Sequence, residues 1–371
     1  MRDAEVVVVG AGAAGLALAC LLGEQGGHEV VLVDAPAGPA RSPDRTWCSW
    51  QTGPTDWEDA VSARWHRVSL HAPDGAARTY DLAPLDYTMI RSGDYEHVAG
   101  ERLARAGVER VEALVTRTAS DGSVEGADLR GRWVFDTRPT PPARPGRVAL
   151  LQHFRGWRVR TAQDRFDPAT ASLMDFRPPQ PPGGVAFGYV LPTSPREALV
   201  EYTEFSREVL TEAAYEAALS RWTGTQLELG DVEVLEVEQG AIPMTDAPFA
   251  RRVGERVFRL GAAGGATRPS TGYTFSAAQR QVRAVAAALQ DGRDPEPPAA
   301  FSRRHLAMDA LLLRAIDTGR LDGAAFFADL FARQPTARVL RFLDGATSLR
   351  EDLAVMASAP AGPMLRTALA H

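Results

Sequence analysis

The sequence predicts an α/β protein, and three observations lead to that fold class. A glycine-rich turn lies between a hydrophobic strand and an alanine-rich helix near the N-terminus. Strand and helix patterns follow as far as about residue 150, and a run of further strand patterns extends to about residue 245. The last quarter of the chain is mostly helical in pattern. We therefore predict a Rossmann-type domain, a mixed β-sheet domain and a helical C-terminal region.

Composition narrows the classes of function. The 371 residues are 45% hydrophobic and 24% charged, which is typical of a globular protein. A net charge of −6 argues against nucleic acid as a partner. All 41 basic residues are arginine, so mechanisms that need a lysine are excluded. Two cysteines and seven histidines without ligand spacing predict no metal site and no disulfide framework, as in a reducing cytosol.

The uncharged run at the N-terminus, Val6–Gly23, has about the length of a membrane span. Asp3 and Glu5 precede it, where a secretory signal carries positive charge. Three glycines at fixed spacing also interrupt the run. We therefore interpret it as a buried strand, a turn and a helix.

The first motif has the order Gly-x-Gly-x-x-Gly. The β-branched run Glu5–Val9 predicts a buried parallel strand, and Ala13–Glu24 predicts a helix. Gly10 permits the tight turn between them, Gly12 lets a pyrophosphate approach the backbone, and Gly15 lets the helix pack closely on the strand. The unpaired N–H groups at the start of this helix favour a phosphate. We expect Ala11 and Ala14 in the same turn to contact the cofactor as well.

A second buried strand, Glu29–Val33, ends at Asp34. That carboxylate stands where a ribose hydroxyl group is bound in dinucleotide-binding proteins. The motif alone does not separate FAD from NAD. Its start almost at residue 1, without a second such motif, favours one FAD over a reductase that binds two nucleotides.

The remaining elements follow in chain order. A hairpin at 67–82 turns at Asp74-Gly75, and a helix is predicted at 94–106. The predicted strands are 108–118, 132–135, 151–161, 171–177, 185–192, 199–205, 232–242 and 256–260. Helices are predicted at 208–222 and at about 274–290. Apolar residues from Met308 to Met356 recur at helical spacing, and we interpret them as stripes that face the core.

These elements predict three regions. Residues 1–150 and 255–295 form a discontinuous cofactor domain, although about 65–100 are candidates for the other sheet. Residues 151–254 form a substrate-binding β-sheet domain. Residues 296–371 form the helical C-terminal region.

Several motifs together resemble the lycopene cyclase family. The second glycine cluster runs from Gly261 to Gly265 and is followed by Arg268-Pro269-Ser270-Thr271-Gly272-Tyr273, similar to the family's Pro-x-Thr-Gly-Tyr motif. Leu199-Val200-Glu201-Tyr202-Thr203 resembles its Phe-Leu-Glu-Glu-Thr signature. Further similar stretches run in order from residue 6 to about 275: 45–50, 87–91, 135–138, 152–157, 174–177, 189–192 and 238–244. The resemblance implies a glutathione-reductase-like FAD fold and an enzyme that closes β-ionone rings on lycopene.

The resemblance also implies roles for single residues. Glu201 stands at the first glutamate of the signature and is implied to be the catalytic acid. Such an acid must be protonated before it acts, so an apolar setting should raise its pKa. The second glutamate of the signature is replaced by Tyr202. Either that acid has no counterpart, or Glu204 substitutes for it.

FAD is the implied cofactor, active in its reduced form, with NAD(P)H as a possible reductant. Gly261, Gly264 and Gly272 are expected to contact FAD, together with the first glycine motif. The reaction is implied to have no net redox change. The aromatic residues expected to line the substrate pocket are Trp47, Trp157, Phe176, Tyr189 and Tyr273. We expect Asp175 and Arg177 to form a structural pair.

Lycopene dissolves in lipid, so we expect a peripheral contact with the cytoplasmic side of a membrane. Arginines among the apolar residues of the last quarter would bind headgroups. Three alternatives stay open. They are a monocyclase that yields γ-carotene, a flavin-dependent hydroxylase or prenyl reductase, and a non-enzymatic prenyl-lipid escort protein.

Overall fold

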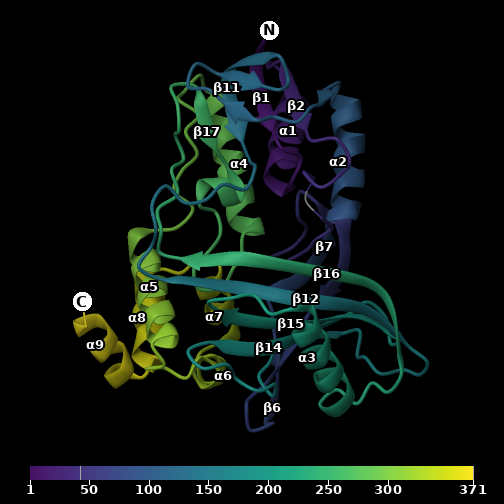
Figure 1. Ribbon diagram of the computed structural model, residues 1–371, viewed down its shortest axis with the longest axis vertical. Helices are drawn as coiled ribbons and strands as arrows, with labels where there is room; N and C mark the ends of the chain where they lie inside the picture. The colour runs from purple at the N-terminus through teal and green to yellow at the C-terminus, as the bar shows by residue number, and fades with distance from the viewer. Residues whose placement is uncertain (42, 371) are drawn as a thin grey trace.

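The computed structural model describes residues 1–41 and 43–370. Position 42 and the last residue of the predicted C-terminal region, 371, lie outside the described part. Figure 1 shows one layer of strands and helices at the top, a long second sheet across the middle, and the C-terminal helices at one end of that sheet. The predicted α/β class is confirmed.

The first sheet contains the glycine motif. Its order is β8-β2-β1-β11-β10-β9, and β17 also pairs with β11. The strands are β1 (Arg2–Val9), β2 (Val30–Asp34), β8 (Glu109–Glu112), β9 (Arg117–Thr118), β10 (Ser123–Glu125), β11 (Leu129–Asp136) and β17 (Val257–Arg259). Four successive valines of β1 are buried, because helices and neighbouring strands cover both faces of this parallel core. The helices on this sheet are α1 (Ala13–Gln25), α2 (Ser92–Ala106) and α4 (Phe275–Gln290).

One predicted strand is divided in two. The sequence suggested a single strand over 108–118, whereas β8 pairs with β2 and β9 pairs with β10. The chain leaves the sheet after β8, and the backbone N–H of Ala113 donates to Asp34. Apolar residues at Val111, Ala113 and Val115 pack on the same core cluster, which explains why the pattern was continuous although the strand is not.

The second sheet has the order β16-β12-β15-β14-β13-β5-β6. Its strands are β5 (Arg67–His71), β6 (Ala77–Asp81), β12 (Ala149–Thr161), β13 (Thr170–Asp175), β14 (Val185–Pro192), β15 (Glu197–Ser206) and β16 (Val232–Thr245). Helix α3 (Glu212–Thr225) covers one face, and we call this the α3 face. The opposite face, called the inner face, packs on the C-terminal helices and on a third sheet.

The third sheet was not predicted. It has the order β3-β7-β4, with β3 (Thr46–Gln51), β4 (Val61–Trp65) and β7 (Asp86–Arg91). A short 3-10 helix, η1 (Glu58–Ala60), precedes β4. The sequence of β3, TWCSWQ, alternates poorly and lacks a β-branched run, so its pattern gave no strand signal. This sheet is nonetheless important, since its strands connect the cofactor domain with the inner face.

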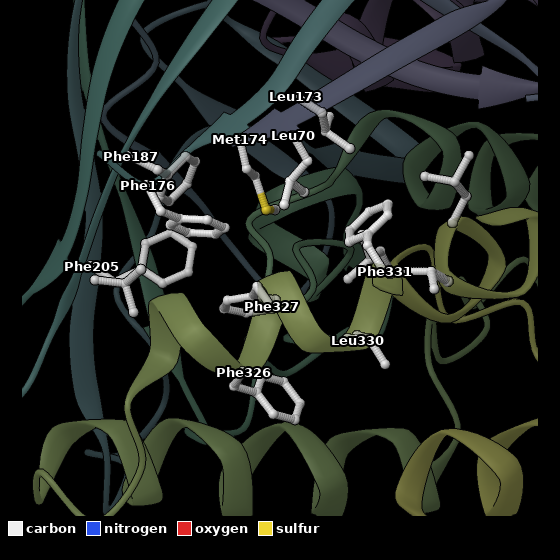
Figure 2. Close-up of a cluster of buried hydrophobic side chains, with 14 of the residues drawn as sticks. Leu70, Leu173, Met174, Phe176, Phe187, Phe205, Phe326, Phe327, Leu330 and Phe331 are labelled. Atoms are coloured by element: carbon white, nitrogen blue, oxygen red, sulfur yellow. The ribbon is translucent and has the colours of Figure 1, made fainter. Parts of the chain in front are cut away.

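The C-terminal region consists of α5 (Arg303–Asp317), α6 (Gly323–Arg333), α7 (Thr336–Leu343), α8 (Leu349–Ser358) and α9 (Ala361–Leu369). Figure 2 shows Phe327 of α6 beside Phe176 and Phe205, whereas Phe331, further along the helix, packs on Tyr80. The prediction of stripes that face the core is confirmed for α5, α6 and α7. It is wrong for α8, where Leu349, Leu353 and Met356 are 60%, 56% and 51% exposed.

Candidate active site

The first glycine motif forms the sharp turn between β1 and α1. Gly10 has a φ of 96°, which a residue with a side chain rarely adopts. A Cβ on Gly15 would lie 1.9 Å from the carbonyl oxygen of Gly10, so only glycine allows this approach of helix and strand. A Cβ on Gly12 would meet nothing within 4 Å. The start of α1 is therefore open at the residue where a pyrophosphate is expected to approach.

Asp34 lies beside this turn at the end of β2. Its carboxylate accepts a hydrogen bond of 3.1 Å from the backbone N–H of Ala11 and pairs with Arg41 at 3.3 Å. Ala14 contacts the second glycine loop, because a Cβ on Gly261 would lie 2.7 Å from the Ala14 Cβ. The structure thus brings together Asp34, the first glycine motif and the second glycine loop.

The second glycine loop runs from Gly261 to Tyr273 towards the second sheet. Gly261 and Gly272 have φ angles of 67° and 72°. The Gln281 side chain of α4 accepts from the Gly261 N–H at 3.1 Å and donates to the Gly264 carbonyl at 3.4 Å, which holds the loop on α4. A Cβ on Gly272 would lie 2.3 Å from Gln152 Oε1, a buried atom without a hydrogen-bond partner. Two tight glycine turns and an unpartnered buried oxygen fit an extended dinucleotide such as FAD.

Glu201 belongs to a row of residues that crosses the second sheet on its inner face. In the register of β16, β12, β15 and β14, Glu238 pairs with Gly156, Gly156 with Glu201, and Glu201 with Tyr189. Residues that pair across neighbouring strands point to the same face. Gly156 has no side chain, so the side chains of Glu201 and Glu238 meet over it. A Cβ there would lie 3.4 Å from Glu201 Cβ and 3.3 Å from Glu238 Cγ.

The two carboxyl groups titrate as a pair. Burial raises the pKa of Glu201 well above its usual value, and the charge of Glu238 and a hydrogen bond with it raise this pKa further. The Thr203 hydroxyl donates to Glu201 Oε1 at 2.9 Å and opposes the shift in part. Burial also raises the pKa of Glu238, which Thr46 and Glu201 lower by donating to it. The pKa of each carboxyl group is thus raised, that of Glu201 more strongly than that of Glu238.

Aromatic hydroxyl groups surround this pair. Tyr273 packs edge-on against Trp50 with ring centroids 4.5 Å apart, and Tyr87 stacks on the same indole. Burial raises the pKa of Tyr189 and of Tyr273, and the charge of Glu201 raises both further. The hydroxyl of Tyr273 is buried without a hydrogen-bond partner. The inner face around Glu201 is thus rich in aromatic rings.

Cys48 of β3 is part of the same surroundings. Burial raises the pKa of its thiol to about 12, and the charges of Glu201 and Glu238 raise it as well. The thiol is therefore protonated at neutral pH and is a weak nucleophile. We assign no chemistry to it.

Two residues singled out from the sequence lie on the α3 face, away from Glu201. Trp157 follows Gly156 along β12, so it points to the opposite side and packs with Tyr215 and Trp222. Glu204 accepts a hydrogen bond of 2.5 Å from the Tyr202 hydroxyl on that same face. The suggestion that Glu204 substitutes for a second acid beside Glu201 is therefore wrong. The prediction that Trp157 lines the pocket around Glu201 is also wrong.

The other predicted pocket residues lie apart from one another. Trp47 stacks on Phe275 at the start of α4, with centroids 5.9 Å apart, and contacts Tyr95. Phe176 packs against Phe187 and Phe327 in the inner-face core (Figure 2). Of the five predicted aromatic residues, only Tyr189 and Tyr273 lie next to Glu201.

A cavity of about 460 Å³ lies beside the carboxyl pair. Glu238, Leu199 and Arg158 of the second sheet line it, and Thr46, Met89 and Arg91 line it from the third sheet. Asp44, Arg45 and Asp94, all exposed, also line it, so the cavity opens to solvent. Its lining is largely polar and charged, which does not suit a polyene.

Two ion pairs elsewhere are structural. Asp175 accepts from Arg177 at 2.6 and 2.8 Å and from the Trp222 indole at 2.9 Å, which confirms the predicted structural pair. Arg268 is fully buried in the second loop and pairs with Asp309 of α5 at 3.0 Å. That pair joins the loop to the C-terminal helices and neutralises the arginine.

The sequence indicates Glu238 only as the first residue of the family-like stretch 238–244. A signal existed, since Gly156 stands in a strand otherwise rich in large side chains, and an isolated glycine in a strand marks a close approach. The partner of that glycine depends on the register of three strands, which the sequence does not state.

The whole chain resembles flavoprotein-type folds in solved structures. A geranylgeranyl bacteriochlorophyll reductase-like protein from Thermoplasma acidophilum matches with a TM-score of 0.70 and 14% identity, covering 99% of this chain and 98% of that one. A p-nitrophenol 4-monooxygenase from Pseudomonas putida matches with 0.63 and 18%, covering 100% and 98%. A flavin-dependent brominase matches with 0.61 and 16%, covering 93% and 94%. These likenesses concern the fold and agree with the predicted Rossmann-type domain.

No curated protein matches the sequence. The family model for lycopene cyclase proteins matches residues 5–369, which includes the glycine turn, the second loop and both carboxyl groups of the inner face. The chain therefore belongs to the lycopene cyclase family.

Proposed function

We propose that the protein is an FAD-dependent lycopene β-cyclase, which forms β-ionone rings at the ψ ends of lycopene. One observation carries the proposal: Glu201 lies half-buried beside Tyr189 and Tyr273, in surroundings that raise its pKa. Cyclisation of an alkene needs a proton donor in a dry site, and a carboxyl group kept neutral by burial can serve as one. Family membership supports the carotenoid class of the substrate.

Glu201 would donate its proton to the terminal double bond of the ψ end. Thr203 holds the carboxyl group in one orientation through the hydrogen bond to Oε1. Tyr189 and Tyr273 present aromatic rings next to the acid, and such rings stabilise a nearby positive charge by about 0.5–2 kcal/mol. Loss of a proton from the ring carbon then gives the β-ionone, with no net oxidation or reduction.

FAD would be held by the two glycine loops and by Asp34. The open start of α1 at Gly12 suits the pyrophosphate, and Asp34 suits a ribose hydroxyl group. When bound in its reduced form, FAD supplies an electron-rich ring that stabilises positive charge nearby. NAD(P)H is the proposed reductant.

The decisive experiment supplies the protein with lycopene in liposomes, FAD and a chemical reductant, and separates the products by chromatography. We expect β-carotene, with γ-carotene as the intermediate of one closed ring. Accumulation of γ-carotene alone would indicate a monocyclase. Unchanged lycopene under reducing conditions would contradict the proposal. Consumption of NAD(P)H in proportion to product would indicate a hydroxylase or prenyl reductase instead.

The role of Glu201 is tested by Glu201→Gln, which keeps the shape of the side chain but cannot donate a carboxyl proton. We expect turnover to fall by about 10²–10⁴-fold, the usual contribution of a general acid, with flavin binding retained. Glu204→Gln is the matched control, since Glu204 is a buried carboxyl on the same strand that faces α3. Near-normal turnover of the Glu201 variant would remove it from the acid role.

The same proposal includes a peripheral contact with the cytoplasmic side of a membrane, where lycopene is dissolved. Within the described residues, no helix is long and apolar enough to span a bilayer. Helices α8 and α9 each expose apolar side chains, at Leu353, Met356, Leu365 and Leu369. Between residues 300 and 370, nine arginines exceed seven acidic residues, although the chain carries a net charge of −6. Apolar side chains beside an excess of arginine suit an anionic leaflet.

A further inference from the structure

We propose that Glu238 is the second carboxyl group of the proton-donating site, where it shares one proton with Glu201 and connects that proton with solvent. Glu238 is thus a positioning and proton-relay residue. The inference rests on the proposed function for its chemistry, but the pairing itself follows from the geometry of the inner face.

The first support is the shape of the sheet. Glu238 and Glu201 lie on β16 and β15, the two strands that flank β12, and both pair with Gly156. Two side chains separated by an intervening strand normally have a third side chain between them. Here the intervening residue is glycine, and the nearest atoms to its missing Cβ include Leu199 Cδ1, Glu238 Cγ and Glu201 Cβ, at 3.0, 3.3 and 3.4 Å. The space above Gly156 is thus shared by Leu199 and the two glutamates.

The second support is the separate hydrogen bonding of each carboxyl group. Thr203, on the same strand as Glu201, donates to Glu201 at 2.9 Å. Thr46, on β3 of the third sheet, donates to Glu238 at 2.7 Å. Each hydroxyl group fixes one carboxyl group, so the bond between the two glutamates relies on the proton that they share. Two carboxyl groups that share a hydrogen bond cannot both be charged without strong repulsion.

The third support is the arrangement of charge around the pair. Arg91 of β7 lowers the pKa of Glu238, and it also pairs with Glu236, whose charge raises that pKa. Cys48, Tyr189 and Tyr273 also lie near the pair, each with a raised pKa, and Arg158 pairs with Glu236 at 3.2 Å. Both arginines line the cavity together with Glu238, so we infer that the negative charge is placed on Glu238 and the proton on Glu201.

The solvent-open cavity makes the surroundings of the two glutamates different. Glu238 lines the solvent-open cavity, whereas Glu201 is not among its lining residues and lies next to Tyr189 and Thr203. A proton that enters from solvent therefore meets Glu238 first and passes to Glu201 through the bond between them. The polyene would approach Glu201 from the aromatic side, so substrate and solvent reach the pair from different directions.

The proton balance of the reaction closes on this pair. The Glu201 proton adds to a terminal alkene carbon, and the π electrons of that double bond form the new C–H bond. The π electrons of a second double bond form the ring C–C bond. A ring carbon then releases a proton to the carboxylate pair, and its C–H electrons form the final double bond. During the cationic stage Glu201 has lost its proton, and the positive charge of the carbocation offsets the repulsion between the two carboxylates.

The test compares Glu238→Gln with wild type and with Glu204→Gln, using flavin-loaded protein and lycopene in liposomes. Activity requires protonated Glu201, so it is lost as pH rises through the pKa of that group. Removing the charge of Glu238 lowers this pKa. We expect the alkaline limit of kcat/KM to move about 1–3 pH units lower in Glu238→Gln and to stay in place in Glu204→Gln. An unchanged alkaline limit in the Glu238 variant would overturn the inference.

A second measurement does not depend on lycopene. Infrared difference spectra of the flavin-loaded protein record the carbonyl stretch of protonated carboxyl groups as pH is varied. We expect a protonated group at neutral pH in wild type, its loss in Glu201→Gln, and its titration at lower pH in Glu238→Gln. Absence of that band in wild type would overturn the pairing. The expected spectra without any turnover of lycopene would uphold the pairing and contradict the cyclase function.

Discussion

At the scale of single residues, Gly156 determines how closely the carboxyl groups of Glu201 and Glu238 approach each other. A side chain at this position would lie between Glu201 and Glu238 and would force the two carboxyl groups apart. The electrostatics of the acid thus depend on a residue that carries no charge. The same applies to Thr46 and Thr203, whose hydroxyl groups orient the two carboxyl groups without titrating.

Gly156→Val is therefore expected to reduce turnover on the order of 100-fold, as small displacements of a catalytic group commonly do. Flavin content should stay normal, because the FAD loops lie on other elements. Steady-state kinetics and flavin absorbance measure the two effects. A variant with normal turnover would show that the two carboxyl groups act independently.

The raised pKa of Glu201 also predicts how stability depends on pH. The folded protein keeps a proton that the unfolded chain releases above about pH 4.3, so stability falls as pH rises from there through the folded-state pKa. Glu201→Gln removes this contribution. We expect thermal unfolding of the variant to show a smaller loss of Tm with rising pH than wild type. Parallel pH profiles of Tm would indicate that Glu201 is ionised in the folded protein.

At the scale of elements, the turn between β1 and α1 separates two functions of glycine. Gly15 is needed for packing, because its Cβ would overlap the Gly10 carbonyl oxygen. Gly12 adopts an ordinary extended conformation with φ −80° and ψ −175°, and its Cβ would have free space. The fold therefore requires glycine at position 15, whereas only a bound ligand would require glycine at position 12.

Gly15→Ala and Gly12→Ala form a matched pair that tests this distinction. We expect Gly15→Ala to lower stability by about 1–3 kcal/mol, the usual range for overpacking. Gly12→Ala should unfold like wild type but bind FAD more weakly. Urea unfolding and flavin titration measure these effects. Normal FAD affinity in Gly12→Ala would place the pyrophosphate elsewhere.

The same scale explains what the sequence could predict. The glycine motif, β1, α1 and β14 were predictable because their signals are local: fixed spacing, a β-branched run and a turn. Glu201 was found through its neighbours in one motif. The partnership with Glu238 was not, because it depends on the registers of β12 with β15 and with β16. Trp157 was wrongly predicted to line the pocket. Side chains alternate along β12, but the sequence does not show which of the two sets faces Glu201.

At the scale of the whole molecule, the exposed face of α8 and α9 contrasts with the core packing of the other C-terminal helices. Leu365 and Leu369 are 59% and 75% exposed, and Leu353 is 56% exposed. Apolar side chains gathered on one surface commonly mark a contact site. Helical periodicity shows that a helix has an apolar side but not what that side contacts. The apolar side of α8 was therefore wrongly predicted to face the core.

The proposed membrane contact is tested by Leu353→Glu combined with Leu369→Glu. We expect the double variant to sediment less with anionic liposomes and to convert liposomal lycopene more slowly, with unchanged flavin content. Val209→Glu is the control, because Val209 is 52% exposed and belongs to the loop between β15 and α3, outside α8 and α9. Equal sedimentation of the two proteins would exclude α8 and α9 as the contact.

The interruption of the first sheet has a consequence for synthesis on the ribosome. β11 is complete at residue 136, but its partner β17 begins at residue 257, and α4, which packs on α1, ends at residue 290. More than a hundred residues of the second sheet must emerge before the edge of β11 is covered. Unpaired strand edges favour aggregation in nascent chains. The N-terminal portion is therefore not a separable cofactor module, and a truncated chain that ends before β17 would leave the ribosome with an open sheet.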